Sequence, residues 1–69
     1  MAHVKIEMDR GLGWETRQEG DCAVTADRLR ELLPLYALQY PHRIFLDGVL
    51  FGEARASRYG NPIVTIARP

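Results

Sequence analysis

Alternation of apolar and polar side chains marks the first element of the chain. Residues 3–10 alternate between charged or polar positions and three apolar ones, Val4, Ile6 and Met8. A period of two is typical of a β-strand with one buried face. The glycines at positions 11 and 13 end this pattern, since glycine adopts turn conformations without steric cost. Residues 14–18 are expected to return as a second strand, with a polar turn at 19–21.

A helix is predicted to begin after Thr25. Thr25 is a favourable N-cap, and Asp27 lies in the first turn, where the helix dipole stabilises a negative charge. Apolar side chains then recur at helical spacing and share one face: Leu29, Leu32, Leu33, Tyr36 and Tyr40. Pro34 removes a backbone donor, so the helix should kink or split there. Leu35 and Leu38 point away from the apolar face of a straight helix.

The strongest local pattern is the Asp47-Gly48 pair between two apolar runs. This pair is typical of a two-residue hairpin turn, because both central positions need a positive φ. The resulting register predicts three facing pairs: Leu46 with Val49, Ile44 with Phe51, and Phe45 with Leu50. The first two pairs should lie on one side of the sheet and the third on the other.

The remaining segment completes an α+β pattern. Residues 55–61 are polar, and the composition of residues 59–62 predicts a turn. Residues 63–67 are rich in β-branched side chains, which is typical of a strand, here the last one. The order of elements is therefore ββαβββ. We expect residues 1–69 to form a single compact domain, with a small antiparallel sheet and one proline-kinked helix packed on one face.

Composition and charge narrow the functional classes. The formal net charge is +0, so nothing attracts the whole chain to nucleic acid or to an anionic membrane. No apolar run is long enough to span a bilayer, and we expect no membrane partner. A single cysteine gives no internal disulfide, and a cytoplasmic location is therefore expected.

Few residues point to catalysis or to a metal. Cys22, His3 and His42 have none of the spacings typical of zinc ligands, and no orienting group accompanies a Cys–His pair. Glu7 and Asp9 share one strand face, which is expected to be solvated. We therefore expect no enzyme activity, no cofactor and no metal site.

The segment Arg55–Asn61 offers one alternative function. Arg55, Arg58 and Tyr59 are residue types that contact phosphates and bases. Dedicated nucleic-acid-binding domains normally carry a basic excess, which this chain lacks. A small nucleic-acid-binding regulator is therefore the alternative interpretation.

Surplus apolar surface supports the preferred interpretation. One helix covers one face of a small sheet, which leaves four apolar side chains for a partner: Phe45, Leu50, Leu35 and Leu38. Monomers seldom leave a contiguous apolar patch in water. The other possibility is that the N-terminal hairpin or a kink at Pro34 covers these side chains.

The expected function is therefore that of a non-enzymatic protein–protein interaction module, with a homodimer as the expected assembly. Its small size and missing chemistry are typical of inhibitors or regulators of a larger host complex, of the phage or mobile-element type; anti-CRISPR proteins are one example. The identity of a protein partner does not follow from the residues.

Overall fold

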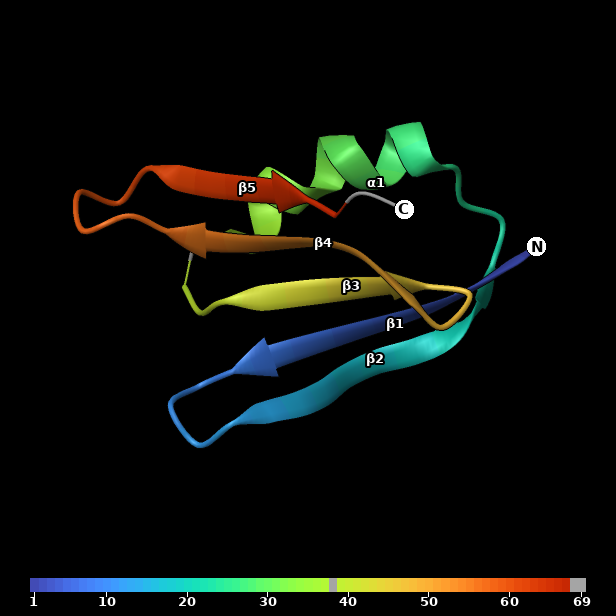
Figure 1. Cartoon of the computed structure of the whole chain (residues 1–69), viewed down its shortest axis with the longest axis horizontal. Coiled ribbons are helices and arrows are strands. Elements are labelled where there is room, and N and C mark those ends of the chain that lie inside the picture. The colour runs from blue at the N-terminus through green and yellow to red at the C-terminus, as the bar shows by residue number, and fades with distance from the viewer. Residues whose placement is uncertain (38, 68–69) are drawn as a thin grey trace.

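The computed structural model describes residues 1–37 and 39–67 of the chain. Its elements are β1 (Ala2–Asp9), β2 (Trp14–Cys22), α1 (Ala26–Leu32), the 3-10 helix η1 (Leu33–Ala37), β3 (His42–Leu46), β4 (Val49–Ala56) and β5 (Pro62–Ile66). All strand pairs are antiparallel, and the sheet order is β2-β1-β3-β4-β5 (Figure 1). The α+β class and the antiparallel sheet predicted from the sequence are thus confirmed. No helix in the described ranges is long and apolar enough to cross a membrane.

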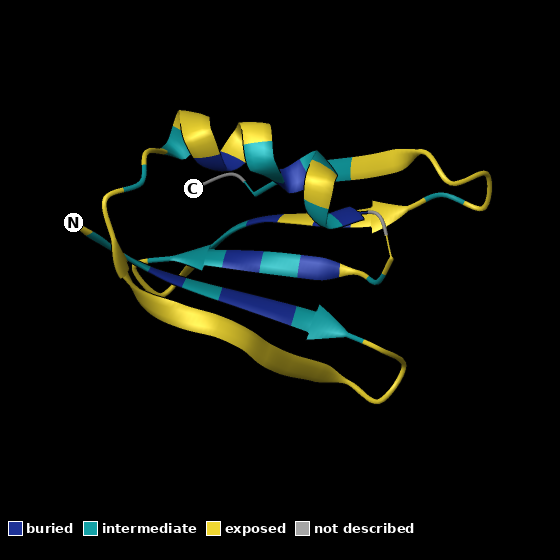
Figure 2. Cartoon of the chain, turned by 180° about the vertical axis from the view of Figure 1, so that it is seen from behind, coloured by how far each residue is buried: buried dark blue, intermediate teal, exposed yellow. Residues whose placement is uncertain are grey.

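The helical segment lies on one face of the sheet, which we call the helix-covered face. η1 packs mainly on β4 and β5, so the helices lie toward the β5 side of the sheet (Figure 2). The other face, here the open face, is covered by no other described segment (Figures 1 and 2). β1 and β2 are therefore only partly covered on either side.

The core joins the helices to the three inner strands and contains few side chains. Its buried apolar members are Leu29, Leu33 and Ala37 from the helices and Val4, Ile6, Ile44 and Ala54 from the sheet. The alternation in β1 predicted the burial of Val4 and Ile6 correctly, whereas Met8 is only half-buried. The buried face of the helical segment is narrower than predicted, because Leu32, Tyr36 and Tyr40 are only half-buried.

The start of α1 follows the predicted cap. The Thr25 hydroxyl accepts a hydrogen bond from the Arg28 N–H at 3.2 Å, which satisfies one free donor of the first turn. α1 ends at Leu32, and the tighter η1 contains Pro34. Proline has no N–H to donate to the preceding turn. Leu35 of η1 remains exposed, whereas Leu38 lies outside the described residues.

The β3–β4 hairpin has the predicted turn but a different register beyond it. Asp47 and Gly48 have φ angles of 51° and 81°, as a turn of this type requires. The pairs nearest the turn, Leu46 with Val49 and Phe45 with Leu50, are confirmed. The predicted pair of Ile44 with Phe51 is wrong, because the register shifts after Phe45.

A glycine explains the position of this register shift. The shift leaves Phe51 as the extra residue and pairs Ile44 with Gly52. A Cβ atom at Gly52 would lie 2.9 Å from the Thr65 carbonyl oxygen and 3.0 Å from Leu33 Cδ1. The bulge therefore places a residue without a side chain where Leu33 of η1 comes close to the sheet.

Strand β2 is longer than predicted. The expected turn at residues 19–21 is wrong, because pairing with β1 continues to Ala2 opposite Cys22. The ring of His3 joins the two strands: Nε2 lies 2.8 Å from Glu19 Oε2, and Nδ1 lies 2.9 Å from Asp21 Oδ1. These hydrogen bonds, from Glu19 first and then from Asp21, raise the pKa of His3 above its ordinary value of 6.5.

We predict that Gly52→Ala destabilises the fold by about 1–3 kcal/mol, because the added methyl group overlaps Leu33 and the β5 backbone. Urea denaturation measures the loss. Gly20→Ala is the matched control, since no atom lies within 4 Å of its added Cβ. Equal stability of both variants and the parent chain would contradict the close approach at Gly52.

The raised pKa of His3 predicts a pH dependence of stability. A raised folded-state pKa means that the stabilisation is fully present below 6.5 and is lost as the pH rises through the higher folded-state value. The urea concentration at the midpoint of denaturation should therefore fall as the pH is raised above 6.5. His3→Gln should remove most of this slope. An unchanged slope in that variant would assign the effect to another group.

Candidate functional site

A cluster around Glu7 organises the open face. Glu7 and Arg43 face each other on β1 and β3, and Arg43 Nε donates a hydrogen bond to Glu7 Oε1. The Arg43 guanidinium carbon lies 4.3 Å from the centroid of the Trp14 ring and 5.3 Å from that of Phe45. Glu7 is consequently only 8% exposed. The expectation of a solvated carboxylate at this position is wrong, because Arg43 on the neighbouring strand and Lys5 on the same strand pair with it.

The electrostatics of this cluster keep Glu7 ionised. The hydrogen bond from Arg43 is the main cause that holds the pKa of Glu7 below its ordinary value, with further help from the charges of Arg43 and Lys5. Burial alone would raise that pKa. The Lys5 ammonium lies 3.5 Å from Glu7 Oε2. The paired carboxylate therefore fixes the position of the Arg43 guanidinium against the two rings.

Two of the predicted partner-binding residues lie beside this cluster. Phe45 and Leu50 face each other on the open face, and both are half-buried. We define the open-face patch as Trp14, Arg43, Phe45 and Leu50. Leu35 is 62% exposed but belongs to η1, on the helix-covered face. The structure therefore does not place Leu35 with Phe45 and Leu50, and Leu38 lies outside the described residues.

Sequence reasoning missed Trp14 and Arg43 as members of the patch. Trp14 opens β2, opposite Asp9, and is 36% exposed. The contact between Trp14 and Arg43 depends on strands β2, β1 and β3 lying side by side, and the register between β1 and β3 does not follow from local pattern. Their residue types were the available signal, because tryptophan and arginine are enriched among the residues that contribute most to protein interfaces.

The predicted nucleic-acid residues are divided between two places. Arg55 lines a hollow of about 230 Å³ beside Trp14, and the carboxylates of Asp9 and Glu53 line the same hollow. Arg58 and Tyr59 lie instead in the exposed β4–β5 turn. The Ser57 hydroxyl accepts hydrogen bonds from the backbone N–H groups of residues 59 and 61, at 3.2 and 3.1 Å, and so orders this turn.

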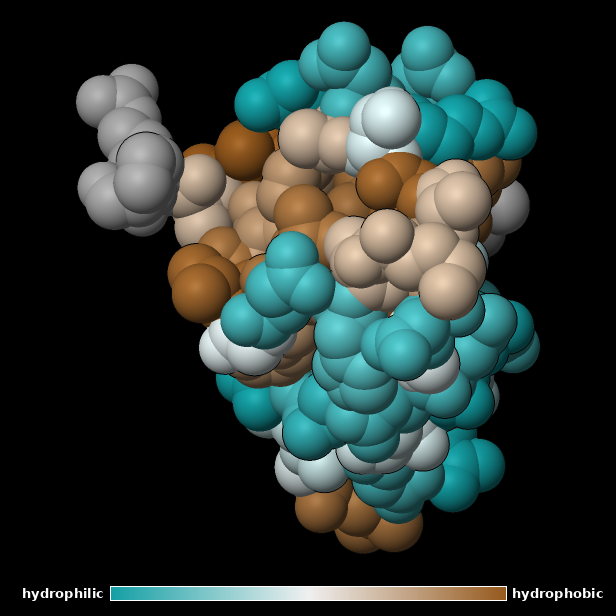
Figure 3. Space-filling model, turned by 90° about the vertical axis from the view of Figure 1, so that its right-hand side faces the viewer, coloured by the Kyte–Doolittle hydropathy of each residue, from teal (hydrophilic) through white to brown (hydrophobic). Residues whose placement is uncertain are grey.

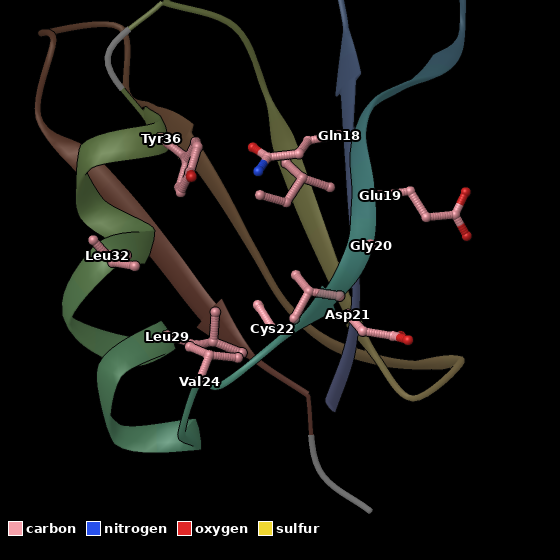
Figure 4. A pocket seen from close by; sticks show the side chains of 11 residues that line it. Gln18, Glu19, Gly20, Asp21, Cys22, Val24, Leu29, Leu32 and Tyr36 are labelled. Atoms are coloured by element: carbon pink, nitrogen blue, oxygen red, sulfur yellow. The ribbon is translucent and has the colours of Figure 1, made fainter. Parts of the chain in front are cut away.

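The cysteine and the histidines lie apart. Cys22 pairs with Ala2 at the start of β1, and His42 faces Met8 near its end. His3 contacts carboxylates on the open face, whereas Cys22 points toward the helices (Figure 4). Across residues 1–37 and 39–67, no set of three or more His, Cys, Asp or Glu side chains could hold a metal ion.

His42 is a buried structural residue. Its Nε2 lies 3.0 Å from Arg17 Nη1, and its Nδ1 lies 2.7 Å from the Tyr40 carbonyl oxygen. Arginine has no acceptor, so Nε2 accepts and the proton of a neutral ring lies on Nδ1, from which it is donated to Tyr40. The ring also packs 5.3 Å from that of Tyr36. Nε2 therefore joins β3 to β2, Nδ1 bonds the segment that leads into β3, and the ring packs against η1.

Two further apolar hollows are lined mainly by residues outside the open-face patch, and Leu50 of that patch also lines the first of them. One is a hollow of about 290 Å³ at the end of the sheet that carries the β3–β4 turn, where apolar surface gathers beneath the polar outer side of the helix (Figure 3). Its lining includes Val49, Phe51 and Ile66. The other is a hollow of about 220 Å³ between α1 and β2, shown in Figure 4.

Comparison with known proteins adds no assignment to these surfaces. No protein-family model matches the chain. Neither the curated proteins nor the solved structures contain a match.

Proposed function

We propose that this chain is a non-enzymatic protein-interaction module that docks through its open face, in the first place against a second copy of itself. The observation that carries this proposal is the open-face patch, in which Arg43 contacts both Trp14 and Phe45 above the paired Glu7 carboxylate. Within the described residues, no segment covers these side chains (Figure 1). A role as a small inhibitor or regulator of a larger complex is the use that we propose for such a module.

The patch has the properties of an interface centre. Interface energy is concentrated in a few aromatic and arginine side chains near the centre of the contact. Here the Arg43 guanidinium is already held by Glu7 and two rings, so little side-chain freedom remains to be lost on binding. Side chains that are ordered before binding reduce the entropic cost of association.

The size of the face fits a second copy. The two longer dimensions of the molecule are 36 and 25 Å, and a stable interface buries roughly 800 Å² on each partner. One sheet face is therefore sufficient. Dimerisation would also stabilise a domain whose own core contains few side chains, because association shifts the folding equilibrium by mass action.

The charges of the open face favour a protein partner over nucleic acid. Lys5 and Arg43 lie close to Glu7, and Arg55 shares its hollow with Asp9 and Glu53. A surface of mixed sign complements another protein surface of mixed sign. Phosphate backbones instead require an uncompensated positive surface.

We predict that Phe45→Asp and Leu50→Asp each weaken self-association while the domain stays folded, since both side chains are half-buried at the patch. Sedimentation equilibrium over a range of concentrations should give a parent mass of twice 7.9 kDa at the upper end. Val49→Asp is the matched control, because Val49 is next to Leu50 in β4 but 66% exposed on the other side of the strand. A parent chain that stays monomeric throughout would refute dimerisation through this face.

The nucleic-acid alternative is decided by salt dependence. Binding of a dye-labelled single-stranded oligonucleotide is measured at several salt concentrations for the parent chain and for Arg55→Ala. We expect weak binding that the substitution leaves unchanged, because carboxylates line the same hollow as Arg55. A steep negative log–log slope that becomes smaller by about one in Arg55→Ala would instead support nucleic-acid binding. Arg28→Ala, on α1, is the charge-matched control.

A further inference from the structure

Strand β2 presents an unusually open edge. It is nine residues long, each of its side chains is exposed, and it lies at the end of the sheet order. A register irregularity near Arg17 interrupts the first half, whereas residues 18–22 pair regularly with β1. The opposite edge strand, β5, has five residues and begins with Pro62. A regular edge with unpaired backbone groups is a template for another extended chain.

An apolar groove runs beside this edge on the helix-covered face. Val4 and Ile6 of β1 form part of its lining, together with Val24, Leu29, Leu32 and Tyr36. Figure 4 shows Leu29, Leu32 and Tyr36 on the helix side and Gln18 and Cys22 on the β2 side. The groove measures about 220 Å³. It exists because the helices pack over β4 and β5 and leave β1 only partly covered.

Because Gly20 has no side chain, the groove is open toward the edge of β2. Gly20 pairs with Val4, so a side chain at this position would point to the helix-covered face. A Cβ atom there would meet no atom within 4 Å. The space beside Val4 is therefore accessible from the strand edge.

The other side of β2 is acidic. Glu19 and Asp21 point away from the groove (Figure 4), and both contact His3 on the open face. Glu15 adds a third carboxylate to the strand, opposite Met8 and paired with Arg10, and Arg17 is the one basic residue of β2. An added strand would therefore meet an apolar groove on one side and carboxylates on the other.

We propose that the groove between α1 and β2 binds an extended basic protein segment, which adds to β2 along residues 18–22 as a further strand. Alternate side chains of a strand point to opposite faces, so an apolar side chain of the segment enters the groove and its lysine or arginine neighbours lie beside Glu19 and Asp21. Backbone hydrogen bonds to the β2 edge give affinity, and the groove selects the inserted side chain.

A second copy of this chain is a poorer occupant of the same edge. Two β2 strands paired with each other would bring together two acidic strands, each with three carboxylates and one arginine. Like charges opposite one another destabilise strand pairing. The charge of β2 therefore favours a foreign basic segment over self-pairing.

This inference rests on the proposed function only in that the ligand is a protein segment. Dimerisation uses the open face, whereas the groove lies on the helix-covered face. Monomeric Leu50→Asp should therefore bind the segment as the parent chain does, because β1 and β3 separate its strand from β2, whereas Phe45 lines a hollow together with Glu19. The two proposals can fail separately.

Fluorescence anisotropy of a dye-labelled seven-residue peptide, Lys-Val-Lys-Leu-Lys-Val-Lys, tests the proposal. We expect saturable binding that Gly20→Val weakens at least about tenfold, because the new side chain occupies the groove while valine suits a strand. Thr16→Val is the matched control, since Thr16 lies on the same strand but faces Glu7 across the pair. Its binding should equal that of the parent chain.

Two N-methylated peptides separate strand addition from simple charge attraction. In one peptide, the methylated backbone nitrogens are the alternating set that faces β2, so these donors are lost. In the other peptide, the methylated nitrogens face away from β2, so the donors toward β2 remain. We expect one methylated peptide to lose binding by at least about tenfold and the other to keep it. Equal binding of both peptides, or undiminished binding by Gly20→Val, would overturn the proposal.

Discussion

The contact between Leu33 and Gly52 determines how the helices lie on the sheet. Leu33 is fully buried, and its Cδ1 atom occupies the space that a side chain at position 52 would need. The bulge at Phe51 brings the glycine to this point. α1 and η1 together are short. Because they are fixed over β4 and β5, they leave the β1–β2 end of the helix-covered face only partly covered. The groove beside β2 is thus a direct result of where the helices are held.

The two faces of the sheet are organised by different interactions. On the helix-covered face, aliphatic side chains pack around Leu33 and Ile44. On the open face, a charge pair between Glu7 and Arg43 takes the central position, and aromatic rings pack on the guanidinium rather than on each other. Because the charges of Glu7 and Arg43 are already paired, a partner can dock over them without the burial of an unpaired ion.

Local features of the fold could be predicted from the sequence, and features that depend on strand register could not. The alternation in β1, the cap at Thr25 and the Asp47-Gly48 turn each depend on a few adjacent residues. The register shift at Phe51 and the full length of β2 depend on neighbouring strands. The same limit applies to the site, because the sequence pointed to Phe45 and Leu50 while the pairing of Arg43 with Glu7 and Trp14 needs three strands in place.

The position of β2 outside the apolar core also has an evolutionary consequence. None of its nine side chains belongs to the core, so most substitutions along it cost little folding free energy. β1 and β3 lack this freedom, because their inner residues carry the packing under Leu33. A lineage carrying this domain can therefore alter the sequence of β2 over generations to follow a changing counterpart, while the scaffold that presents the strand stays the same.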